Sequence, residues 1–176
     1  MYESKLSIAV TEEEIKAAIN AKAEEYKEIY KGEKLIIVAE LSGVFVFLAD
    51  FLRALELDVL IQFVAFDKIA DKKQIELDLE SAVDFKDANV LIVSDVFYKG
   101  NSLKRLVDVV KSKSPKHVRT LALVNRVCSE KNNDIEVEAL FETDERKLVG
   151  YGLANKESYR GLKGLYYLDE SETPNE

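Results

Sequence analysis

A buried strand that leads through a glycine turn into a helix constrains this chain more than any other feature. Residues Val90 to Val93 form a continuous aliphatic run, which is typical of a strand buried on both faces of a parallel sheet. Asp95 follows at the carboxyl end of that strand, and Gly100 permits a tight turn before a helix. Asn101 or Ser102 can cap this helix, whose first backbone N–H groups favour an anion. The segment predicts an anion site at the edge of an α/β sheet.

The rest of the chain alternates strands and helices. Thr11 and Glu14 have capping-box spacing before an amphipathic helix that Gly32 ends. Apolar runs and turn residues predict strands at 35–39, 59–66, 90–96, 118–127 and 136–141, helices at 45–55 and 103–110, and a polar hairpin at 67–79. This order predicts the α/β class, with a doubly wound parallel sheet of about five strands and flanking helices.

Length and composition indicate one domain. The chain has 176 residues and is 47% hydrophobic, which is enough for one core and too little for two full domains. We expect a single domain over residues 1–168 and a polar tail over residues 169–176.

Charge and cysteine content restrict the partners and the compartment. The net charge of −8 argues against a nucleic-acid or anionic-membrane surface, because the field of the protein would repel both. The single cysteine, Cys128, cannot form an internal disulfide, which favours a reducing compartment. No segment approaches the ~20 apolar residues that cross a bilayer, and no signal peptide is evident. We therefore expect a cytoplasmic protein.

The stretch from Val90 to Leu103 resembles the 5-phosphoribosyl pyrophosphate (PRPP) motif of the type I phosphoribosyltransferases, with Asp95, Gly100 and Ser102 at matching positions. Further blocks at 41–55, 134–137, 149–153 and 159–160 are similar to the hypoxanthine-guanine phosphoribosyltransferases. Members of that family join a 6-oxopurine to PRPP and release pyrophosphate in the presence of Mg²⁺. The resemblance implies a small hood, made from the N-terminal helix and residues 150–168. The apolar helix at 45–55, with Phe45, Phe47 and Phe51 on different faces, separately predicts an oligomer interface, and we expect a homodimer or homotetramer.

The resemblance assigns one set of residues to the phosphate side of the site. It implies that PRPP is held by Asp95, Lys99, Gly100, Asn101 and Ser102, with Asp95 also a weak candidate for contact with Mg²⁺. The pyrophosphate loop corresponds to Leu41, Ser42 and Gly43, with Ser42 where the family has a lysine, and Arg160 is expected on the pyrophosphate side.

Other positions depart from the family pattern. Ser94 replaces an acidic residue, and Tyr98 stands where the family has its catalytic aspartate. A phenol is a poor proton acceptor at neutral pH, and losing one acid-base group typically lowers the rate by about 10²–10⁴. For Tyr98, ordinary packing as a half-buried aromatic side chain is the alternative to catalysis.

The base-binding side also differs. By resemblance it consists of Arg126, Lys147 and Leu148, with Arg126 where a lysine contacts the 6-oxo group and Lys147 where an aromatic ring stacks on the base. Pairing of both cations with Glu142 or Asp144 is the alternative, as is a salt bridge from Arg160 to Glu157.

Two main hypotheses for function follow. The first is a purine-salvage transferase that uses PRPP and Mg²⁺, slow or altered in base specificity, for which the cationic pair makes an anionic base worth testing. The second is a non-catalytic sensor or regulatory subunit that binds PRPP or a purine nucleotide. A scaffold subunit that pairs with an active relative is a third option.

Overall fold

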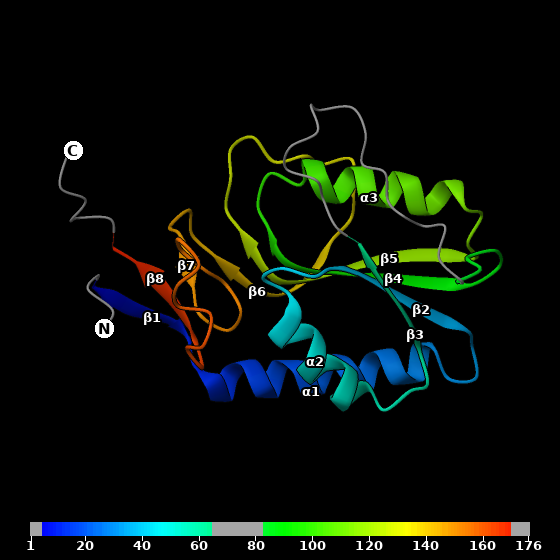
Figure 1. The fold of residues 1–176 in the computed structure, drawn as a ribbon, viewed down its shortest axis with the longest axis horizontal. Helices are drawn as coiled ribbons and strands as arrows, with labels where there is room; N and C mark the ends of the chain where they lie inside the picture. Colours follow the sequence, from blue (N-terminus) through cyan, green and yellow to red (C-terminus); the bar gives the residue numbers. More distant parts are fainter. Residues whose placement is uncertain (1–4, 65–82, 170–176) are drawn as a thin grey trace.

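Five parallel strands form the central sheet of the computed structural model, which describes residues 5–64 and 83–169 (Figure 1). Their order across the sheet is β3-β2-β4-β5-β6. The bounds are β2 Leu35–Glu40, β3 Leu60–Val64, β4 Asn89–Phe97, β5 His117–Arg126 and β6 Glu138–Thr143. Strands β2, β4 and β5 occupy the middle, and their apolar runs are buried because helices cover both faces. The predicted doubly wound sheet is confirmed.

Three helices supply the two outer layers. Helices α1 (Glu12–Ile29) and α2 (Phe45–Leu55) cover one face of the sheet, and α3 (Asn101–Ser112) covers the other, as Figure 1 shows. Each face has its own apolar core, because alternate residues of every central strand point to opposite sides. The capping box at Thr11 is confirmed, since the Thr11 hydroxyl accepts from the Glu14 N–H and the Glu14 carboxylate accepts from the Thr11 N–H.

A second, antiparallel sheet lies to one side of the large one (Figure 1). It consists of β1 (Leu6–Val10), β8 (Leu165–Leu168) and β7 (Leu148–Val149), in that order. The sequence analysis predicted none of these strands, because each is short and gains its hydrogen bonds only from a partner distant in the chain. The hood was expected to contain the N-terminal helix. In the structure the N-terminal segment that joins the small sheet is the strand β1, whereas the helix α1 packs against α2.

Strand β4 extends to Phe97, one residue beyond the predicted end, and Asp95 lies near the carboxyl end of the strand as predicted. The prediction about the helix cap was wrong. The N-cap of α3 is Gly100, with no side-chain cap hydrogen bond, so neither Asn101 nor Ser102 caps the helix. The left-handed conformation of Gly100 turns the chain sharply enough for the helix to begin one residue later. The hairpin predicted at 67–79 lies outside the described residues.

No helix within residues 5–64 and 83–169 combines the length and apolar character that a membrane span requires. Helix α2 is apolar for a different reason, since Phe47 and Phe51 are fully buried beneath it in the core. Phe45, at the start of the same helix, is 42% exposed.

Candidate functional site

A pocket of about 390 Å³ lies where β2 and β4 end and α3 begins. Its lining includes Glu40 at the end of β2, Ser42 in the loop that follows, Asp95 near the end of β4, and the segment from Tyr98 to Ser102. The carboxyl edge of a parallel sheet is where open α/β proteins bind ligands. The structure therefore brings Ser42 and the segment from Asp95 to Ser102 together, and we call this cavity the phosphate-side pocket.

Asp95 occupies a confined place in this pocket. The residue is half-buried, but its carboxyl group lies close against Gly43, and one carboxylate oxygen accepts a 2.7 Å hydrogen bond from the Val96 N–H. Loss of contact with water raises the pKa of Asp95, which outweighs the opposite effects of the Val96 N–H and the Arg160 guanidinium. Its charged form is therefore poorly solvated until something binds it.

Three segments far apart in the sequence touch beside Asp95. A methyl group added at Gly43 would overlap the Asp95 carboxyl, and one added at Gly152 would overlap the Gly43 carbonyl. Arg160 donates a 2.8 Å hydrogen bond to the Gly152 carbonyl and pairs with Glu157 at 2.8 Å. The loop after β2, the end of β4 and the segment from 152 to 160 thus form one contact cluster.

The turn before α3 supplies backbone donors. Asn101 and Ser102 are exposed in the first turn of the helix, where backbone N–H groups have no partner within the helix. Lys99 is also exposed, and its ammonium pairs with Glu130, which raises the pKa of Lys99 and lowers that of Glu130. A phosphate at this turn would meet the helix N-terminus first and would compete with Glu130 for Lys99.

Tyr98 and Arg126 form a stacked pair. The guanidinium carbon of Arg126 lies 3.7 Å from the centroid of the Tyr98 ring. The Nε atom of Arg126 is buried and has no hydrogen-bond partner. The contact arises because Tyr98 follows β4, Arg126 ends β5, and the two strands are paired in parallel. Neither Glu142 nor Asp144 pairs with Arg126, because Asn125 donates to Glu142 and Arg146 pairs with Asp144.

A second cavity, of about 500 Å³, lies beyond this stack, and we call it the base-side pocket. It is lined by Arg126, Glu145, Arg146, Lys147, Leu168 and Asp169. The ammonium of Lys147 donates a 2.6 Å hydrogen bond to the Asn155 side chain. Leu148 does not line this cavity; its side chain is buried, and its strand β7 pairs with β8.

Sequence reasoning missed two residues beside the stack. Lys131 donates to the Arg126 carbonyl at 2.8 Å and to the Asn125 side chain, and its ammonium lies 4.7 Å from the centroid of the Phe97 ring. Asn125 in turn donates to Glu142. The only sequence signal was their position at and after the carboxyl end of β5, and no motif marks them. The contact between Gly152 and Gly43 was missed as well, because 108 residues lie between them in the sequence.

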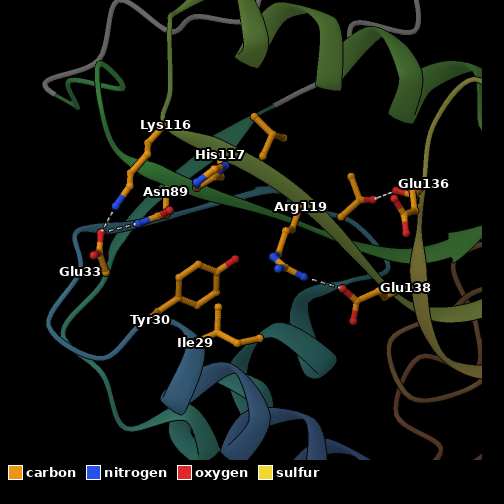
Figure 2. A pocket seen from close by; sticks show the side chains of 11 residues that line it. Ile29, Tyr30, Glu33, Asn89, Lys116, His117, Arg119, Glu136 and Glu138 are labelled. Atoms are coloured by element: carbon orange, nitrogen blue, oxygen red, sulfur yellow. Dashed lines mark hydrogen bonds and ion pairs between the residues drawn. The ribbon is translucent and has the colours of Figure 1, made fainter.

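A larger pocket, of about 610 Å³, lies at the opposite, amino-terminal edge of the sheet (Figure 2). Its basic residues already have partners: Lys116 pairs with Glu33 at 2.8 Å, and Arg119 pairs with Glu138 at 3.3 Å. Asn89 also donates to Glu33. A ligand would have to break these contacts, so the smaller pocket at the carboxyl edge is the stronger candidate site. His117, at the start of β5, belongs to this distant edge.

Comparison with known families shows which proteins this chain is similar to. The family described as phosphoribosyl transferase domain matches residues 9–156 of this chain. The chain is 30% identical over 167 residues to a hypoxanthine phosphoribosyltransferase of Buchnera aphidicola, covering 89% of this chain and 92% of the relative. It is 29% identical over 174 residues to a hypoxanthine-guanine phosphoribosyltransferase of Aquifex aeolicus, and this match covers 94% of this chain and 96% of that relative.

Several solved structures of phosphoribosyltransferases superpose on this chain. A Trypanosoma cruzi hypoxanthine phosphoribosyltransferase mutant, complexed with the product IMP, superposes with a TM-score of 0.85 at 24% identity and covers 97% of this chain and 94% of that one. A hypoxanthine-guanine-xanthine phosphoribosyltransferase superposes with a TM-score of 0.83 at 21% identity, covering 97% and 98%. At these identities the superpositions establish the fold.

Proposed function

This chain belongs to the phosphoribosyl transferase domain family and, within it, to the hypoxanthine and hypoxanthine-guanine phosphoribosyltransferases, and we propose that it transfers the 5-phosphoribosyl group of PRPP to a 6-oxopurine. The observation that carries this proposal is the convergence of Asp95, Gly43 and Arg160 at the carboxyl edge of the sheet. A non-catalytic sensor finds no support among these relatives, which are named as transferases.

Each part of the cluster has a proposed role in holding PRPP. Asp95 accepts hydrogen bonds from the ribose hydroxyls, which would replace the water that its carboxylate lacks. The backbone N–H groups of Asn101 and Ser102, with Lys99, hold the 5′-phosphate at the start of α3. The pyrophosphate lies against the backbone of Ser42 and Gly43 and beside the Arg160 guanidinium, which supplies positive charge there.

The reaction follows from this placement. A ring nitrogen of the base attacks C1 of the ribose, the bond from C1 to the pyrophosphate oxygen breaks, and pyrophosphate leaves with the electron pair. The proton of the attacking ring passes to solvent. PRPP and the base are held on the two sides of the Tyr98–Arg126 stack. The attack of one bound reactant on the other then behaves as a unimolecular step, which lowers its entropic cost. Arg160 and the backbone N–H groups of the loop after β2 stabilise the charge that develops on pyrophosphate.

Mg²⁺, which the family resemblance implies, fits this site only together with substrate. Within residues 5–64 and 83–169 no three acidic, histidine or cysteine side chains cluster to hold a metal, and at the phosphate-side pocket Asp95 stands next to Ser94, a hydroxyl. Mg²⁺ usually keeps several waters and uses one or two carboxylates plus substrate phosphates. Asp95 and the pyrophosphate oxygens would hold it, and the ion would neutralise phosphate charge.

The expected result of a calorimetric titration follows from that fit. Mg²⁺ alone should give no measurable binding heat, whereas PRPP should bind in the presence of Mg²⁺ and should bind much more weakly when the metal is chelated. Tight binding of Mg²⁺ to the free protein would contradict this, because the described residues bring no three acidic, histidine or cysteine side chains together to hold the ion.

A direct assay tests the proposed activity. The protein is incubated with PRPP, Mg²⁺ and, separately, hypoxanthine, guanine or xanthine, and nucleotide formation is followed by chromatography. Formation of any of the three nucleotides supports the proposal. Absence of product with all three, together with absence of PRPP binding, would overturn it.

We also propose that the protein is a homodimer or homotetramer. Large apolar side chains are exposed around the β2 loop and the edge strand β3, namely Leu41 at 58%, Phe45 at 42% and Phe63 at 47%. Contiguous exposed apolar surface marks interaction sites in soluble proteins. Light scattering should therefore give a mass of two or four chains, and Phe45→Glu should shift the protein toward the monomer. A wild-type monomer at micromolar concentration would refute this.

A further inference from the structure

The stack of Arg126 on Tyr98 holds a cation in a defined plane between the two pockets. Tyr98 lines the phosphate-side pocket, Arg126 lines the base-side pocket, and their 3.7 Å contact joins the two. A guanidinium stacked on an aromatic ring keeps its N–H groups in a fixed fork. Because Nε is buried without a partner, this fork has hydrogen-bonding capacity that the protein itself does not use.

Charge in the base-side pocket is distributed unevenly. Arg146 also stacks on a tyrosine, Tyr167, at 3.6 Å, but Asp144 binds its guanidinium at 2.7 Å. Asp144, and to a lesser degree Asp169, raise the pKa of Arg146, and Glu145 is exposed to water. In the described part of the chain no ion pair joins Arg126 or Lys147 to a carboxylate. Two cations therefore remain for a ligand in a protein whose net charge is −8.

The group beside the acceptor is a phenol. A neutral 6-oxopurine must lose a ring proton when its nitrogen becomes bonded to ribose, and Tyr98 is a poor acceptor for that proton at neutral pH. An anionic acceptor depends less on a strong base, because its negative charge offsets the positive charge that develops on the attacking ring. It would instead need cationic donors, and a carboxylate at position 98 would repel it.

We propose that the preferred acceptor is an anionic purine, namely the 2,6-dioxopurine xanthine in its ionised form, and that Arg126 is the residue that selects it. This inference rests on the proposed transferase function and specifies its substrate. A ring nitrogen of the anion attacks C1 of PRPP, the bond from C1 to oxygen breaks, and pyrophosphate leaves with the electron pair. The proton on the other nitrogen of the attacking ring then passes to solvent. Arg126 and Lys147 bind the anionic ring. Tyr98 acts as a positioning residue, because the Arg126 guanidinium stacks on its ring and is held in one orientation.

The pH dependence of base preference tests the inference. Xanthine ionises near neutral pH, whereas hypoxanthine stays neutral until the solution is more alkaline. The ratio of kcat/KM for xanthine to that for hypoxanthine should therefore rise between pH 6 and pH 8 in the wild type. The titratable groups around the stack are Tyr98, Lys131, Glu145, Lys147 and Asp169. The kcat/KM for hypoxanthine, measured at the same pH values, shows how the titration of these protein groups alone changes activity.

Substitutions separate the two roles. Arg126→Gln should lower kcat/KM for xanthine by about 10- to 100-fold, the range expected for losing one hydrogen bond between charged groups, and should change hypoxanthine much less. Tyr98→Phe keeps the ring and should preserve the xanthine preference, while Tyr98→Ala should reduce it mainly through KM. Arg126→Lys keeps the charge without the fork and should give an intermediate preference.

Arg119→Gln is the control, because Arg119 is also an arginine of β5 but lies at the opposite, amino-terminal edge of the sheet, where it pairs with Glu138. It should leave the base preference unchanged. Thermal unfolding of each variant verifies that it is folded. A wild type that prefers hypoxanthine at every pH, or an Arg126→Gln variant that loses both bases equally, would overturn the inference. If no base gives product, calorimetry with IMP and XMP decides: binding of neither refutes the transferase function, and tighter binding of IMP refutes only the choice of an anionic base.

Discussion

Replacing Gly152 with alanine is expected to lower the free energy of unfolding by about 2–4 kcal/mol and to abolish PRPP binding. Gly152 has a φ of +96°, which is unfavourable for a residue with a side chain, and the added methyl group would overlap the Gly43 carbonyl. Neither obstacle can be relieved by a side-chain rotation, because both involve backbone. The segment that carries Arg160 must then move away from the loop after β2, and the two would no longer hold one pyrophosphate.

Gly161→Ala provides the control in the same segment. A methyl group at Gly161 meets no atom within 4 Å, and the substitution should therefore change stability by less than about 1 kcal/mol. Urea unfolding of both variants and calorimetry with PRPP and Mg²⁺ measure the two effects. A Gly152→Ala protein as stable as Gly161→Ala would show that the backbone contact between 43 and 152 is absent in solution.

Asp95→Asn is expected to stabilise the free protein while removing its function. In the wild type a carboxylate is confined against Gly43, where burial raises its pKa. An amide of the same shape can still accept the Val96 N–H and carries no charge to be desolvated. The gain at pH 7 should be about 0.5–2 kcal/mol, the size of other changes that relieve functional strain. The same substitution should lower kcat/KM by about 10²-fold, because the ribose hydroxyls lose a charged acceptor.

The pH dependence gives this prediction a definite sign. A raised pKa in the folded state means that the folded protein binds the proton more tightly than the unfolded chain does. The wild type is therefore destabilised as pH rises from the ordinary aspartate pKa through the raised value, and Asp95→Asn is not. The stability difference between variant and wild type should be small at pH 4 and largest above neutrality, as measured by urea unfolding at each pH. A difference that grows toward acid pH would show that Asp95 is stabilised as a carboxylate.

Local patterns were sufficient for most of the large sheet. The apolar run from Val90 to Val93 is buried on both faces as predicted, and the predicted helix from Phe45 to Leu55 has the same bounds in the structure. Both depend on the character of consecutive residues, which the chain shows directly. The short strands β1, β7 and β8 were not predictable in this way, because two to five residues carry too weak a pattern and their pairing joins the two ends of the domain.

The candidate site likewise has a part that the sequence predicts and a part that depends on the tertiary structure. The sequence by itself determined the family, the parallel sheet and the segment that carries Asp95, because strand, glycine turn and helix are adjacent in the chain. Only the tertiary structure decided which side chains meet. It placed Gly43 against Asp95, Gly152 against Gly43, and Arg126 on the ring of Tyr98. These contacts depend on the order of strands in the sheet and on close approach between backbones, which no spacing in the sequence encodes. As a result, Tyr98, which stands where the family has its catalytic aspartate, is also the aromatic ring on which the Arg126 guanidinium stacks.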